Sequence, residues 1–159
     1  MTGPSEPAQP GLQPAPDLEL PDTHGTPVRL SALRGGPVLL VFFPFAFSRI
    51  CHGELAELRD HLAEFTSRGV RLFGVSTDPM FALRAWSEQE AFGFELLSDF
   101  WPHGQAARRF EVFDERNGHA RRGSFLIDAD GHVRWATVNP HGQARELDEY
   151  REALAALSG

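Results

Sequence analysis

Apolar residues in the middle of the chain follow two alternating patterns. Residues 38–43 are continuously apolar, which is typical of a strand covered on both faces, as in parallel sheets, and residues 70–76 predict a second strand. Residues 54–66 and 79–92 instead carry apolar side chains at helical spacing with charged residues between them. The order strand, helix, strand, helix predicts a parallel βαβ core.

Shorter patterns on both sides of this core complete the predicted fold. Two apolar runs flank a turn that contains Asp130-Gly131 and predict an antiparallel hairpin, and an apolar stripe predicts a closing helix over 143–157. The other predicted elements are a hairpin formed by 18–20 and 28–30, a strand at 95–98 and a helix at 105–110. This order predicts an α/β thioredoxin fold, in which helices flank a mixed central sheet and an N-terminal β-hairpin is added.

The N-terminal segment differs from the rest in composition. Seven of the twelve prolines lie within the first 27 residues, and residues 1–16 contain almost nothing that could be buried. We therefore expect residues 1–16 to form a flexible tail and 17–159 to form one domain. The first residues do not combine a basic start with an apolar core, so we expect no secretory signal and a cytoplasmic protein. The longest apolar run is far short of the about 20 residues that cross a bilayer, so no membrane association is expected.

Composition excludes several classes of function. Twenty-two acidic residues against fifteen basic ones give a net charge of -7, which argues against a nucleic-acid-binding module. A single cysteine excludes a disulfide within the chain and a cysteine-rich zinc site. All the basic residues are arginine, so no lysine can form a Schiff base or a P-loop. The seven histidines show no ligand spacing, and we expect neither metal nor organic cofactor.

Cys51 occupies a reactive position in this pattern. It follows the first apolar strand by eight residues and begins the first long helix. Unpaired N–H groups and the positive end of the helix dipole stabilise a thiolate there, and the thiolate is the nucleophilic form. Ser48 can place its hydroxyl beside the sulfur, and Pro44 can shield it. Glu54, one turn later, can orient a guanidinium, but a carboxylate alone favours the neutral thiol, so a cation is required nearby.

The residues around Cys51 resemble the active-site signature of the peroxiredoxins. That signature is a proline, a Thr or Ser four residues later, the peroxidatic cysteine after three more, and a Glu one turn on, as in Phe-Phe-Pro-Phe-Ala-Phe-Ser-Arg-Ile-Cys-His-Gly-Glu-Leu over 42–55. Further matching stretches lie at 75–78, 97–102 and 121–128, so the resemblance extends from about Leu18 to Leu157. The segment 98–104 and the absence of a second cysteine resemble the one-cysteine subgroup called alkyl hydroperoxide reductase E.

This resemblance implies a thiol peroxidase that reduces hydrogen peroxide, organic hydroperoxides and peroxynitrite. It makes Cys51 the peroxidatic nucleophile and, by its motif, selects Arg122 rather than the adjacent Arg121 as the cation. Ser48 departs from the more usual Thr, which keeps the hydroxyl but loses a methyl group that restrains the rotamer.

The single cysteine also predicts how the enzyme is regenerated. Peroxide converts Cys51 to a sulfenic acid, and an external thiol or redoxin must reduce it. The resemblance implies mycothiol with mycoredoxin as the reductant, and it implies a homodimer. Two alternatives stay open: a thioredoxin-fold redox sensor that is oxidised as a signal, and a peroxiredoxin of the bacterioferritin-comigratory type that uses thioredoxin.

Overall fold

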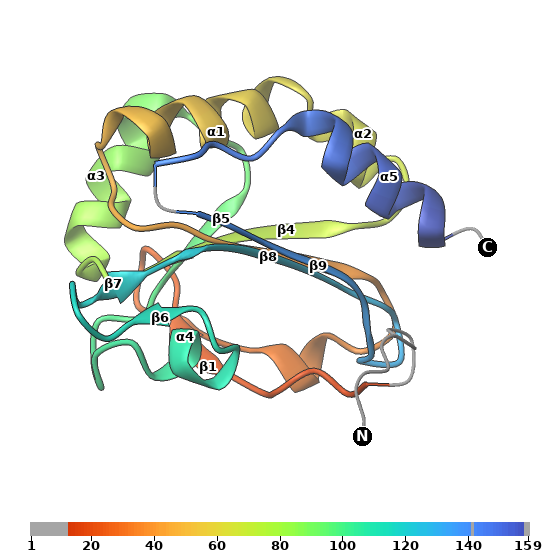
Figure 1. Ribbon diagram of the computed structural model, residues 1–159, viewed down its shortest axis with the longest axis horizontal. Coiled ribbons are helices and arrows are strands. Elements are labelled where there is room, and N and C mark those ends of the chain that lie inside the picture. Colours follow the sequence, from red (N-terminus) through yellow and green to blue (C-terminus); the bar gives the residue numbers. More distant parts are fainter. Residues whose placement is uncertain (1–12, 141, 158–159) are drawn as a thin grey trace.

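A mixed five-stranded sheet forms the centre of the computed structural model, which describes residues 13–140 and 142–157 (Figure 1). The strand order is β5-β4-β3-β8-β9. β3, β4 and β5 are parallel to one another, β8 runs antiparallel to β3, and β9 runs antiparallel to β8. The strands are β3 (Val38–Phe42), β4 (Arg71–Ser76), β5 (Glu95–Ser98), β8 (Arg122–Ile127) and β9 (Val133–Asn139).

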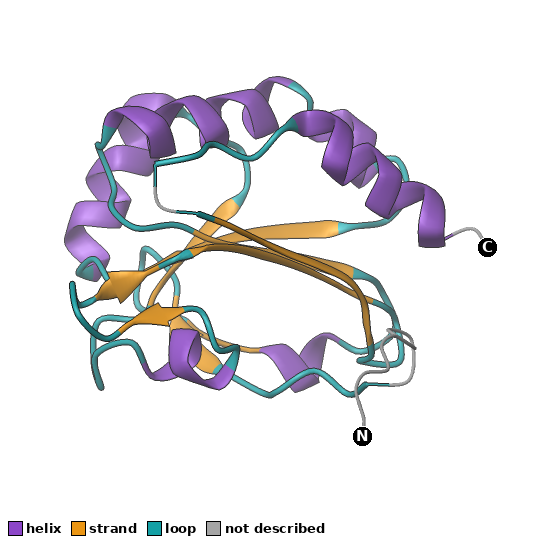
Figure 2. Cartoon of the chain, viewed as in Figure 1, coloured by secondary structure: helices purple, strands orange, loops and turns teal. Residues whose placement is uncertain are grey.

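Helices cover one face of the sheet, and shorter elements cover the other (Figure 2). The first group comprises α1 (Arg49–Asp60), α2 (Leu62–Thr66), α3 (Met80–Glu90) and α5 (Leu147–Leu157). The second comprises the hairpin β1 (Glu19–Pro21) and β2 (Pro27–Arg29), the 3-10 helix η3 (Leu30–Leu33) and α4 (Gln105–Arg109). A second small hairpin pairs β6 (Phe113–Asp114) with β7 (His119–Ala120).

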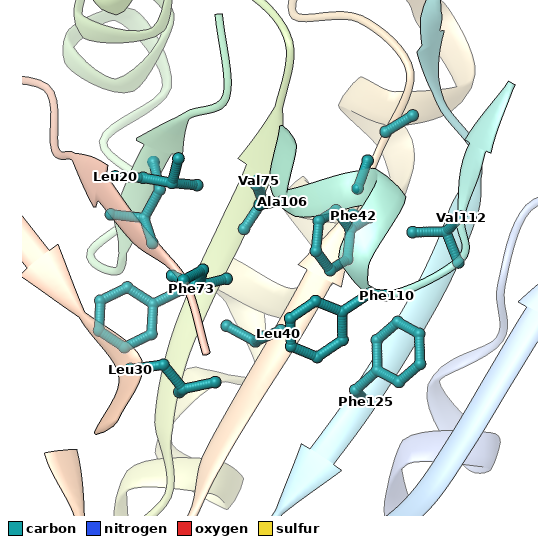
Figure 3. Packing of buried hydrophobic residues seen from close by; sticks show 14 of the residues in the cluster. Leu20, Leu30, Leu40, Phe42, Phe73, Val75, Ala106, Phe110, Val112 and Phe125 are labelled. Atoms are coloured by element: carbon teal, nitrogen blue, oxygen red, sulfur yellow. The ribbon is translucent and has the colours of Figure 1, made fainter. Parts of the chain in front are cut away.

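Strand β3 is covered on both faces of the sheet, which explains its continuously apolar sequence. All five of its residues are buried, because successive side chains enter different cores. Leu40 and Phe42 pack into the cluster beneath the sheet, which Figure 3 shows from close by. Leu39 and Val41 pack on the opposite face, against α1 and α5. Full burial of each such side chain stabilises the fold by about 1.5–3 kcal/mol.

The predicted order of elements is confirmed, but two helix boundaries are wrong. The first helix was expected over 54–66, whereas α1 already begins at Arg49 and a break at His61 separates it from α2. The last helix was expected from residue 143, whereas α5 begins at Leu147. The side-chain amide of Asn139 donates to the carbonyls of residues 143 and 144, which holds this stretch outside the helix. Strand β7 was not predicted.

The expected tail over 1–16 lies mostly outside the described residues. Its described part is hydrogen-bonded: Ala15 N donates to Gly131 O at 2.9 Å, and Val133 N donates to Gln13 O at 2.8 Å. The chain therefore pairs with the turn between β8 and β9 from residue 13, four residues before the expected boundary. Among the described residues, no helix is long and apolar enough to cross a membrane.

Candidate active site

Cys51 lies in the first turn of α1, which begins two residues before it. Its side chain is 0% exposed and joins a cluster with Phe43 and Trp86 beneath the loop 44–48. At this position the first amide groups of α1 have no helical carbonyl partner, and the positive end of the helix dipole lies close to the sulfur.

Arg122 is the cation beside Cys51. It is the first residue of β8, its side chain is buried, and its Nη2 donates to Cys51 Sγ at 3.5 Å. Arg121 is exposed, because successive residues of an extended chain point to opposite sides. The structure thus places the arginine selected by motif next to the thiol and directs its neighbour away.

Glu54 lies between two buried arginines. Its Oε1 accepts from Arg122 Nε at 3.3 Å, which agrees with the predicted orienting contact. Its other partner is Arg145, whose backbone N, Nε and Nη2 donate to the carboxylate at 2.7, 3.0 and 3.0 Å. Burial opposes the charge on Arg145, but Tyr150, Glu54 and Cys51 raise its pKa above the ordinary value. Two cations and one carboxylate therefore lie near the thiol.

Arg145 also joins three elements of the fold. Its Nη1 donates to the carbonyls of Phe42 and Gly123 at 2.7 and 3.1 Å and to Ser124 Oγ at 2.9 Å. This side chain fixes the end of β3 and the start of β8 relative to α1. Sequence reasoning missed it, because Arg145 fell within the amphipathic helix predicted over 143–157, where a single arginine is usually a solvated residue. The one available signal was Glu54, because a carboxylate that is buried needs a cationic partner.

Ser48 and Pro44 lie at the mouth of the site rather than at the sulfur. A cavity of about 260 Å³ is lined by Pro44, Ser48 and Arg122, together with Phe45, Arg49, Ile50 and Gly142. Ser48 precedes α1, and its hydroxyl donates to Phe45 O at 2.9 Å. The hydrogen bond that the structure gives to this hydroxyl is therefore to the loop backbone and not to Cys51.

Contacts from the next βα connection hold the loop 44–48 in place. Asp78 Oδ2 accepts from Ala46 N at 2.8 Å and from Ser76 Oγ at 2.6 Å. Phe47 has a left-handed backbone with φ of 68°, and its ring lies 5.9 Å from that of Trp86. A non-glycine residue in this region is strained, so the loop depends on these contacts to keep its shape.

Comparison with known proteins agrees with this arrangement. The family model described as AhpC/TSA family matches residues 12–136. Alkyl hydroperoxide reductase E of Mycobacterium tuberculosis is 44% identical over 145 residues, covering 91% of this chain and 95% of the relative. Peroxiredoxin 2 of Thermoplasma acidophilum is 34% identical, covering 91% of this chain and 74% of the relative.

Two crystal structures confirm the predicted thioredoxin-like fold with its N-terminal hairpin. Enterococcus faecalis AhpC superposes with a TM-score of 0.81 at 30% identity, covering 91% of this chain and 89% of the other. Peroxidoxin BcpB from Mycobacterium tuberculosis gives a TM-score of 0.80 at 34% identity, covering 92% and 94%. This chain, with its one cysteine, therefore belongs to the AhpC/TSA family and is a one-cysteine peroxiredoxin, a peroxidase similar to alkyl hydroperoxide reductase E.

Proposed function

We propose that the Cys51 thiolate reduces hydrogen peroxide, organic hydroperoxides and peroxynitrite. For a hydroperoxide, the sulfur attacks the terminal oxygen, an S–O bond forms and the O–O bond breaks. Cys51 becomes a sulfenic acid, and the departing oxygen takes a proton from water and leaves as alcohol or water. The observation that carries this proposal is the 3.5 Å contact between Arg122 Nη2 and Cys51 Sγ, in the first turn of α1 and at the wall of the cavity.

The site is suited to the charge that moves during this reaction. Arg122 contacts the sulfur and lines the cavity, so its guanidinium can follow negative charge from the thiolate to the departing oxygen. Ser48 donates its proton to Phe45 O, which leaves the lone pairs of its oxygen free to accept from the peroxide O–H. Pro44 lines the mouth of the cavity through which the peroxide would enter. Glu54 supports the reaction by orienting Arg122.

The reductant is an external thiol, because the chain holds one cysteine. The candidates are mycothiol with mycoredoxin, which the resemblance of the sequence implies, and thioredoxin as the alternative. The sulfur of Cys51 is fully buried, so a reductant must enter through the cavity or displace the loop 44–48.

The homodimer stays a prediction, supported by exposed Phe45 and Phe47 beside the site.

Two measurements test this function. Reduced protein is mixed with one equivalent of hydrogen peroxide and then with a sulfenic-acid trap, and mass spectrometry locates the product. We expect one trap molecule on Cys51 and none on Cys51→Ser. Peroxide turnover is then compared with mycothiol plus mycoredoxin and with thioredoxin. Rapid oxidation without recycling by either system would favour a redox sensor, and absence of the trapped product would refute the peroxidase chemistry.

A further inference from the structure

Tyr150 is the only tyrosine of the chain, and it brings a hydroxyl group into an apolar core. It lies on the buried face of α5, with its ring against Phe65 and Trp135 at centroid distances of 6.2 and 5.7 Å. Its hydroxyl is 2.9 Å from Ser124 Oγ. Apolar packing explains the ring but not the polar contact at its end.

Ser124 links this phenol to the arginines of the active site. Its side chain is fully buried on β8, and its Oγ accepts from Arg145 Nη1 at 2.9 Å. Burial raises the pKa of Tyr150 above its ordinary value, although the charge of Arg145 and the hydrogen bond with Ser124 act in the opposite direction. The phenol therefore keeps its proton, and the charged groups that act on it are Arg145, Glu54 and Glu149.

The contacts form one continuous path from α5 to the sulfur. Arg145 donates to Glu54, Glu54 accepts from Arg122, and Arg122 donates to Cys51. The six side chains of the path, from Tyr150 and Ser124 to Cys51, are at most 6% exposed. Because water cannot easily replace a lost partner here, a change at one end alters the geometry of the next contact.

The position of Ser124 explains how it can direct Arg145. Nη1 of Arg145 carries two protons but has three acceptors: the Ser124 hydroxyl and the carbonyls of Phe42 and Gly123. The rigid guanidinium presents its Nε and Nη2 to Glu54 on the other side. A shift at Nη1 must therefore rotate the whole planar guanidinium, including the Nε and Nη2 groups that donate to the Glu54 carboxylate.

We propose that Ser124 and Tyr150 are positioning residues of the peroxidatic site, which aim Arg145 at Glu54 and thereby hold Arg122 on Cys51. This inference rests on the proposed function of Cys51 and extends it to the C-terminal helix. Neither hydroxyl contacts the sulfur, so both act through the arginines.

Tyr150→Phe and Ser124→Ala test the proposal, because each removes a hydroxyl from a buried site and little else. Loss of one such hydrogen bond is expected to slow the reaction of Cys51 with hydrogen peroxide about three- to tenfold. The midpoint of the thiolate absorbance titration should move to higher pH in both variants. In a Glu54→Gln background, Tyr150→Phe should add no further effect, since its path to the sulfur is already broken.

Leu154→Ala is the matched control. Leu154 is buried on the same face of α5 and packs in the same cluster as Tyr150, but its side chain makes no polar contact. This variant should lower the thermal unfolding midpoint and leave the peroxide rate and the titration within twofold of the wild type.

The outcomes separate this inference from the proposed function. If wild-type Cys51 reacts rapidly and Tyr150→Phe and Ser124→Ala match it in rate and titration, the positioning role is refuted while the peroxidase stands. An equal loss of rate in Leu154→Ala would also refute it, because loosened packing would then be the cause. If wild-type Cys51 itself reacts no faster than a free thiol, the proposed function fails.

Discussion

Arg122→Gln is the substitution that most directly probes the charge beside Cys51. It removes a guanidinium 3.5 Å from the sulfur in a buried site and keeps a hydrogen-bonding side chain. At an effective dielectric constant of about 20, two unit charges at this distance attract by about 5 kcal/mol, and Glu54 offsets part of this attraction. The lower limit is one charge-assisted hydrogen bond, about 1.5 kcal/mol. The thiolate absorbance of Arg122→Gln should therefore appear at higher pH than that of the wild type.

The assay is the ultraviolet absorbance of the thiolate as a function of pH, followed by the rate with hydrogen peroxide at neutral pH. Removal of one positioned donor to a developing negative charge costs about 100- to 1,000-fold in rate. Arg121→Gln is the matched control, because it removes the same charge from the adjacent, exposed position. Equal shifts in the two variants, or an unchanged midpoint in Arg122→Gln, would refute the assignment of Arg122.

Four further predictions concern stability. Gly74→Ala should lower the free energy of unfolding by about 1–3 kcal/mol in urea titrations, because its new Cβ would lie 2.8 Å from a leucine methyl on β5. Gly53→Ala, which enters open space on α1, should raise it by about 0.5–1 kcal/mol, and the opposite order would contradict the packing described here. Glu54→Gln removes the carboxylate that two buried guanidinium groups share and should cost about 3–5 kcal/mol, so an unchanged urea midpoint would show that the buried ion pairs are not formed. Partial burial raises the pKa of Asp17, but hydrogen bonds from Ser31 outweigh this and leave it below the ordinary value. This contribution to stability is present above about pH 4 and is lost as the pH falls through the lowered pKa, so Asp17→Asn should remove that part of the acid dependence of unfolding.

Most of the fold could be predicted from local patterns, because apolar runs indicate buried strands and turn residues indicate where hairpins lie. The continuous apolar run at 38–43 became β3, and the turn at Asp130-Gly131 joined β8 to β9. Helix ends were less accurate, since they depend on partners that are distant in sequence. Residues 143–146 have the composition of a helix, but Asn139 and Glu54 hold their backbone elsewhere.

The active site was predictable only as far as its motif extends. Cys51 and Glu54 could be placed because they share a helix, and Arg122 could be chosen because its motif distinguishes it from Arg121. Arg145 could not be found, since it reaches Glu54 across 91 residues of sequence. The contact of Ser48 was also not predictable, because the loop conformation decides whether its hydroxyl faces the sulfur or Phe45 O.

The central claim is that Cys51 is a nucleophile activated for peroxide, and a stopped-flow experiment tests it most directly. Trp86 lies in the same buried cluster as Cys51, so its fluorescence should report oxidation of the sulfur. Reduced wild-type protein mixed with hydrogen peroxide at neutral pH should show a rapid change that is linear in peroxide concentration and absent in Cys51→Ser. A rate constant no greater than that of a free thiol in solution would contradict the account.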